Sequence, residues 1–122
     1  MSDFKIKADD TLPWLTATIY YAGTTTPVDL SGAAATFSMR PLDSDTPKIN
    51  KEDAEILAPA TNGQVQYRWQ VGDTDTVGKF EAEFEITFPT LTTAAPGDGP
   101  TTQILTAPDN SYLIIEVIED VA

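Results

Sequence analysis

Hydrophobic and polar residues alternate strictly over residues 78–89, which read GKFEAEFEITFP. The apolar side chains fall on even positions from Phe80 to Phe88, and the odd positions between them carry Glu81, Glu83 and Glu85. A strand would place these two sets on opposite faces, whereas a helix would scatter the aromatic rings around its circumference. The pattern therefore predicts a long strand with one buried apolar face and one solvated acidic face.

Weaker versions of the same alternation predict further strands. They cover residues 4–8, 14–21, 33–40, 65–69, 103–106 and 112–118. The turn-forming residues 71–75 favour antiparallel pairing of strand 65–69 with strand 78–89, although a longer crossover remains an alternative. Residues 48–58 are compatible with either one helical turn or an irregular strand. In strand 4–8, outward-facing Lys5 and Lys7 are typical of a protected sheet edge.

The predicted strands are short and follow one another at spacings of roughly ten residues. Nine prolines and seven glycines lie along the chain, and no segment is long enough for a crossover helix. This organisation is typical of an antiparallel sandwich. We predict an all-β sandwich of about seven to nine strands, forming a single domain over residues 1–122 with a long loop over residues 90–102.

Composition narrows the possible functions. Nineteen acidic residues against seven basic ones give a net charge of −12, which disfavours nucleic acid and anionic membranes as partners. The chain has no cysteine and no histidine, so disulfides, thiolate chemistry and Ser/His/Asp triads are excluded. No signal peptide or membrane span is predicted, and the absence of cysteine suits assembly in a reducing cytoplasm.

The acidic clusters are the candidates for chemistry. Neighbouring glutamates of strand 78–89 would lie roughly 7 Å apart, too far for one small ion to bind a pair unaided. Asp73 and Asp75 resemble the opening of a calcium loop but lack its glycine and its final glutamate, so we interpret them as turn residues. Glycoside hydrolysis would need one acid buried in a cleft. We therefore expect no catalytic, cofactor-binding or metal-binding residue, and no enzymatic activity.

Aromatic and aliphatic residues supply the candidate contact positions. Five rings on predicted inward faces are assigned to the core: Tyr67, Trp69, Phe80, Phe84 and Phe88. Trp14 lies near a strand start and is a candidate contact residue. The tandem Tyr20-Tyr21 would put one ring on each face of its strand, which makes Tyr20 a second candidate. Residues 112–118, YLIIEVI, are apolar on both faces and predict a strand covered on both sides or lying at an interface, with Ile114 and Ile115 as contact candidates.

Several landmarks follow one another in an order that resembles a known family. They are residues 4–20 as an opening strand pair, PVDLSGA at 27–33, TFSMR at 36–40, NGQVQYRW at 62–69, DTVGKFEAEF at 75–84 and PDNSYL at 108–113. Taken together, they are similar to the N-terminal domain of the phage baseplate upper protein family, an immunoglobulin-like sandwich of siphophage tail and receptor-binding structures. The resemblance extends over nearly the whole chain.

This resemblance implies an immunoglobulin-like β-sandwich and a non-enzymatic structural role in a bacteriophage virion. The expected partners are other virion proteins of the tail, baseplate, neck, connector or capsid. The chain would join them as a homo-oligomer or in multiple copies, in a virion assembled in the host cytoplasm. The N-terminal strand, the loop at 90–102 and strand 112–118 are the expected contact segments. The alternative is a carbohydrate-binding or adhesion module that recognises host surface glycans, an analogy by fold.

Overall fold

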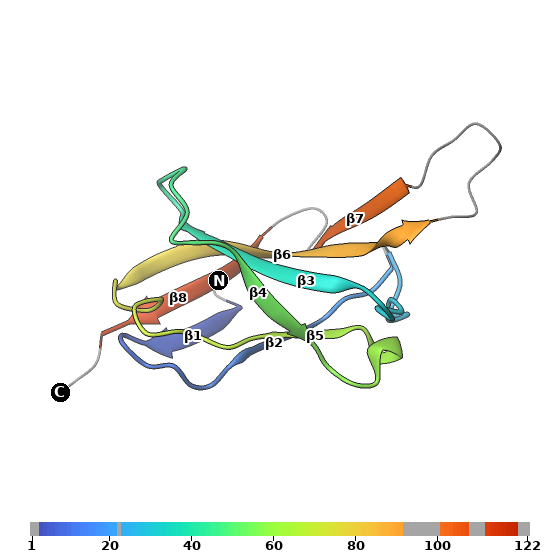
Figure 1. The fold of residues 1–122 in the computed structure, drawn as a ribbon. Coiled ribbons are helices and arrows are strands. Elements are labelled where there is room, and N and C mark those ends of the chain that lie inside the picture. The colour runs from blue at the N-terminus through green and yellow to red at the C-terminus, as the bar shows by residue number, and fades with distance from the viewer. Residues whose placement is uncertain (1–2, 22, 92–100, 108–111, 120–122) are drawn as a thin grey trace.

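The computed structural model describes residues 3–21, 23–91, 101–107 and 112–119 (Figure 1). Within them lie eight strands and one short 3₁₀ turn, η1 at Ala60–Asn62. The strands are β1 Phe4–Lys7, β2 Leu15–Thr18, β3 Ala34–Pro41, β4 Ile49–Ile56, β5 Gln64–Tyr67, β6 Gly78–Leu91, β7 Thr101–Ala107 and β8 Leu113–Ile118. The part of the chain that the structure describes contains no α-helix, which confirms the predicted all-β class.

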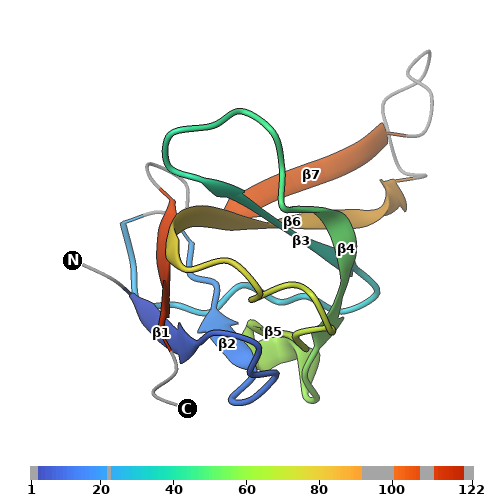
Figure 2. The same ribbon diagram turned by 90° about the vertical axis from the view of Figure 1, so that its left-hand side faces the viewer.

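The strands form a strongly curved, sandwich-like sheet. Seven of them follow the order β1-β8-β6-β3-β4-β5-β2, and β7 pairs with β6 beside that path. The two ends of the path, β1 and β2, lie beside each other in both ribbon views, so the sheet nearly closes into a barrel (Figures 1 and 2). All pairings are antiparallel except that of β1 with β8, which is parallel and departs from the expected antiparallel arrangement.

The corner between the two layers is made by β4. Its first part pairs with β3, and its last residues, Glu55 and Ile56, pair with β5 in the other layer. At Lys51 the backbone has φ +51° and the register against β3 shifts, the signature of a bulge that bends a strand. The ambiguous segment 48–58 is therefore an irregular strand, not a helical turn.

The longest strand, β6, lies at the centre of the other layer and pairs with β3, β7 and β8. Along one edge of β6, residues 80–87 pair with the whole of β3, residues 34–41. The opposite edge is shared, because β8 pairs with residues 78–82 and β7 with residues 84–91. The expected pairing of strand 65–69 with strand 78–89 is wrong: β5 pairs with β2 and β4, and residues 68–77 cross from one layer to the other.

An aromatic cluster fills the space between the layers. Phe37 stacks on Tyr67 with 4.5 Å between ring centroids and packs against Phe84 at 5.0 Å and Trp69 at 5.8 Å. These rings are buried, as are Phe80 and Ile86 on the same face of β6. Alternation thus assigned the core side of β6 correctly, and aromatic pairs of this kind add to the stabilisation that comes from burial.

Two turns tie the crossover to the core. The Tyr67 hydroxyl donates to Asp73 Oδ2 at 2.6 Å, and the Gln70 amide donates to the same oxygen at 2.8 Å. The Thr74 hydroxyl is buried and donates to the Asp10 carbonyl at 2.8 Å. Asp73 is therefore a turn residue, as interpreted from the sequence.

Candidate functional site

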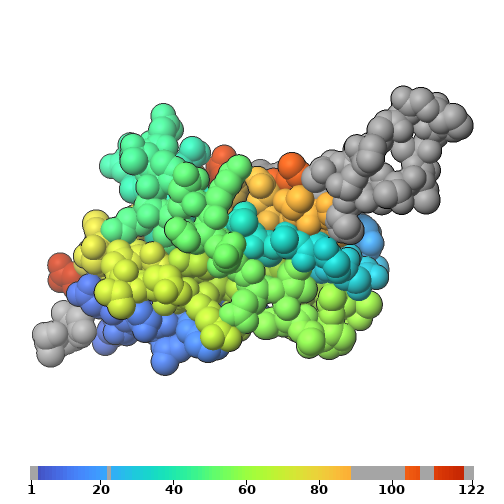
Figure 3. Space-filling view, in the orientation of Figure 1, coloured from blue at the N-terminus to red at the C-terminus, as the bar shows by residue number. Residues whose placement is uncertain are grey.

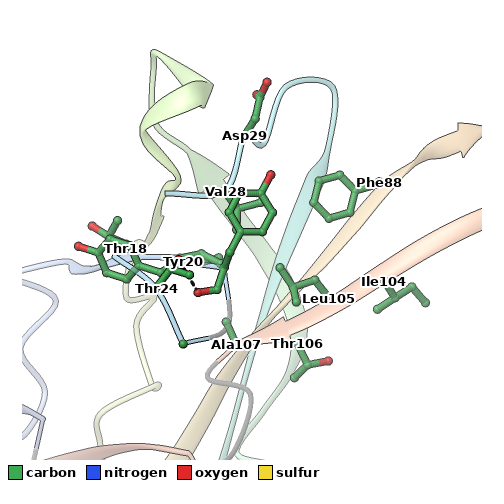
Figure 4. A pocket seen from close by; sticks show the side chains of 13 residues that line it. Thr18, Tyr20, Thr24, Val28, Asp29, Phe88, Ile104, Leu105, Thr106 and Ala107 are labelled. Atoms are coloured by element: carbon green, nitrogen blue, oxygen red, sulfur yellow. Dashed lines mark hydrogen bonds between the residues drawn. The ribbon is translucent and has the colours of Figure 1, made fainter. Parts of the chain in front are cut away.

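A groove opens on the side of the molecule where the two layers diverge. One wall comes from the described residues of segment 18–29, that is residues 18–21 and 23–29, which begins at the end of β2. The other wall is β7 together with the end of β6 (Figure 4). The groove has a volume of about 910 Å³ and is open to solvent. Its lining residues are Thr18, Ile19, Tyr20, Tyr21, Gly23, Thr24, Val28, Asp29, Phe88, Ile104, Leu105, Thr106 and Ala107.

Backbone hydrogen bonds join the two ends of the first wall. Tyr20 pairs with Pro27 as an isolated bridge, and the Tyr21 amide donates to the Thr26 carbonyl at 3.0 Å. Thr24 closes the turn by donating its amide and its hydroxyl to the Tyr21 carbonyl, at 3.0 and 2.8 Å. Tyr20 and Tyr21 are 48% and 51% exposed, so both tandem rings reach solvent, where sequence reasoning expected only one.

Asp29 carries the charge of this wall. Its Oδ1 accepts hydrogen bonds from the Ser31 amide at 3.0 Å and from the Ser31 hydroxyl at 2.6 Å. These bonds favour the ionised form and lower the pKa of Asp29 below its usual value. Val28 and Leu30, on either side of Asp29, are buried, which fixes the turn that presents the carboxylate.

The second wall is apolar. Phe88 and Leu105 are half-buried and lie on the faces of β6 and β7 that are turned toward segment 18–29 (Figure 4). Ile104 projects to the other side of β7 and is 62% exposed. The exposed rings of the first wall and the half-buried apolar side chains of the second wall therefore lie around one opening, which is typical of a binding surface.

The acidic face of β6 is partly covered, and some of its carboxylates are paired with cations. Glu81 is only 16% exposed, and its Oε1 lies 2.6 Å from Arg40 Nε; Glu85 Oε2 lies 3.9 Å from Lys51 Nζ. The expectation of a fully solvated face needs correction, because these carboxylates are half-buried and partly paired with cations. The projecting loop 42–48 stands over this face (Figures 1 and 3) and bounds a hollow of about 220 Å³ beside Arg40 and Tyr112. Within the described ranges, no group of three or more acidic, His or Cys side chains could hold a metal ion.

The predicted contact residues do not form one site. Tyr20 lies in the groove, whereas Trp14 is exposed elsewhere with the Arg68 guanidinium 4.4 Å from the centre of its ring. Ile114 pairs with Glu81 on the outer face, while Ile115 pairs with Phe80 and is fully buried.

Ile115 is therefore a core residue, which corrects its assignment as a contact. Pairing of a partner through strand 112–118 is also excluded by this arrangement, because β1 and β6 occupy the two edges of β8.

Other expectations fall on segments at the margins of the described chain. Both ends of the loop predicted over 90–102 are strand instead, because residues 90–91 belong to β6 and residues 101–102 to β7; residues 92–100 lie outside the described residues. The N-terminal strand is the predicted edge strand β1, with Lys5 and Lys7 exposed. Sequence reasoning missed Phe88 and Leu105 as groove residues, because alternation marks them only as inward-facing.

Comparison with protein-family models, curated proteins and solved structures gives no match to this chain. Among the residues that the structure describes, no helix has the length and apolar character needed to cross a membrane.

Proposed function

We propose that this chain is a non-enzymatic structural protein of a bacteriophage virion, which docks onto another virion protein through the groove between segment 18–29 and β7. The observation that carries the proposal is the groove itself. Tyr20 and Tyr21 expose large rings at an opening whose second wall includes half-buried Phe88 and Leu105. Protein interfaces are enriched in such aromatic residues, and bound partners commonly insert side chains into openings of this kind.

The sequence resemblance supports a virion role. The segment PVDLSGA at 27–33 contains the Asp29–Ser31 turn, TFSMR at 36–40 lies in β3, and the later landmarks include β5 and the first half of β6. These landmarks thus correspond to turns and strands of one continuous fold. Val28 and Asp29 of the turn at 27–33 also line the first wall of the groove. Residues that carry the resemblance therefore also contribute to the groove.

Mass spectrometry of purified particles tests this function, using a phage whose genome encodes the chain. We expect the protein in every mature particle, in a constant ratio to the other structural proteins. Replacing Tyr20 and Tyr21 together by serine should reduce its incorporation, because the groove would lose both exposed rings. Tyr112→Ser is the matched control, since Tyr112 is an exposed tyrosine outside the groove. Absence of the protein from mature particles would refute the proposal.

A second candidate function, glycan binding, is favoured by one feature of the same groove. Exposed Tyr20 and Tyr21 line the same groove as Thr18, Thr24 and Asp29, which carry two hydroxyls and a carboxylate. Aromatic faces combined with a few polar groups suit a sugar ring, which has apolar C–H faces and hydroxyl edges. Trp14 is a poorer platform, because Arg68 already covers part of its ring.

Titration of the isolated chain with host wall polysaccharide separates the two candidates. Glycan binding that is lost in Tyr20→Ser and retained in Tyr112→Ser would favour the adhesion role. Loss in Trp14→Ala instead would place the glycan away from the groove. No binding of the polysaccharide by the wild-type chain would leave virion docking as the better account.

A further inference from the structure

The outer edge of β7 is an open sheet edge. In the described part of the chain β7 pairs only with β6, and no other backbone hydrogen bond involves residues 101–107. The two strands at the ends of the sheet, β1 and β2, lie beside each other where the sheet nearly closes (Figures 1 and 2). The free edge of β7 therefore differs from theirs, because it faces away from the rest of the sheet.

This edge also lacks the features that protect sheet edges from pairing. The sequence of β7, TTQILTA, contains no charge, proline or glycine over seven residues. By contrast, β1 is four residues long and carries exposed Lys5 and Lys7. A long, uncharged edge with an exposed aliphatic side chain, here Ile104, is a template for another strand.

We propose that β7 pairs with the β7 strand of a second copy of this chain, antiparallel and about a two-fold axis at Ile104. Residue 104 is the midpoint of residues 101–107, so this register pairs all seven residues, whereas any shift leaves strand ends unpaired. Ile104 would lie beside Ile104 of the other copy on one face of the sheet, which removes part of each exposed side chain from water. The sheet would continue from one copy into the next.

Electrostatics favours a second copy at this edge. Two chains that each carry a net charge of −12 repel one another over most of their surfaces, and contact is least costly where the charge is absent. The strand β7 is such a place. Glu85, the carboxylate that pairs with Thr106 across β6 and β7, lies 3.9 Å from the Lys51 ammonium, which offsets its charge. The inference concerns self-association and does not depend on the function proposed above.

Single cysteines test this register, because the chain has none of its own. In the proposed dimer, residue 104 and its mate are directly opposite with Cα atoms about 4.5–5.5 Å apart, within reach of a disulfide. Residue 106 lies two positions from the axis, so its Cα and that of its mate are about 14 Å apart, beyond that reach. Ile104→Cys should form a disulfide-linked dimer under mild oxidation, and Thr106→Cys should not.

Val71→Cys is the control for random collision, because Val71 is almost fully exposed on a turn far from β7 in the sequence. We expect the wild-type chain to sediment as a dimer and Ile104→Lys to sediment as a folded monomer, since the lysines would meet at the axis. A monomeric wild-type chain overturns the proposal. Cross-linking of Thr106→Cys in place of Ile104→Cys, or equal cross-linking of Ile104→Cys and Val71→Cys, also overturns it. Sedimentation of the wild type decides the matter even if a variant fails to fold.

Discussion

At the scale of single residues, Gly63 is required both by its backbone conformation and by the atoms packed against it. Its φ of +67° lies in the left-handed region, and a Cβ added there would lie 2.8 Å from the Ile19 carbonyl oxygen and 3.0 Å from that of Val28. Gly23 has a similar φ of +74°, but a Cβ added there would meet no atom within 4 Å. Substitutions at these two glycines therefore distinguish the cost of backbone strain, present at both, from the cost of steric contact, present only at Gly63.

Gly63→Ala should lower the free energy of unfolding by more than about 2 kcal/mol, because strain and backbone contact add. Gly23→Ala should lower the free energy of unfolding by about 1 kcal/mol, because only backbone strain contributes there. Denaturant unfolding of both variants measures the difference. Equal losses would show that the contact of Gly63 with segment 18–29 is not as tight as described.

Tyr67 predicts a dependence of stability on alkaline pH. Burial, followed by the hydrogen bond to Asp73, raises the pKa of Tyr67 above its ordinary value. The folded protein therefore keeps a proton that the unfolded chain releases above about pH 10, so this contribution to stability is complete below that pH and is lost as the pH rises further.

At about pH 8, Tyr67→Phe should have a free energy of unfolding about 1 kcal/mol lower than the wild type, because the hydrogen bond is missing. Between about pH 8 and about pH 11, the free energy of unfolding should fall less for Tyr67→Phe than for the wild type. Denaturant unfolding of both proteins at the two pH values measures this. Parallel pH profiles would contradict the assigned role of Tyr67.

At the scale of elements, the sequence predicts a strand well where one face of that strand is buried. It does not predict a strand whose structure depends on pairing with a neighbouring strand. The alternation in β6 predicted both its extent and its buried face, since Phe84 and Glu83 differ so strongly in their preference for water. Segment 48–58 has no such contrast, because most of β4 is polar and four consecutive residues of it are exposed. Pairing with β3 makes this segment a strand. Sequence patterns also could not show that residues 68–77 change layers, because that path depends on the Asp73 turn.

A pair of substitutions on β6 tests this sorting of side chains. Phe84→Ala should lower the free energy of unfolding by about 3–5 kcal/mol, the cost of a large cavity in the aromatic cluster. Glu83→Ala, on the opposite face, should change it by less than about 0.5 kcal/mol. Comparable losses from the two substitutions, measured by denaturant unfolding, would contradict the sorting.

At the scale of the whole molecule, the groove is the feature that no local pattern could reveal. Tyr20 was recognised from its tandem position, but its neighbours Phe88 and Leu105 are more than sixty residues away in the sequence. They meet Tyr20 only because β7 continues the sheet beside β6 while segment 18–29 follows the other layer. Candidate residues chosen strand by strand therefore included Ile115, which the fold buries.

Hydrogen exchange in assembled particles tests most directly the claim that this groove is the docking surface. Amide exchange of the particle-bound chain would be compared with that of the free chain, segment by segment. The account predicts slower exchange over residues 18–29 in the particle. Unchanged exchange over these residues, with slowing confined to segments such as the loop 42–48, would contradict it.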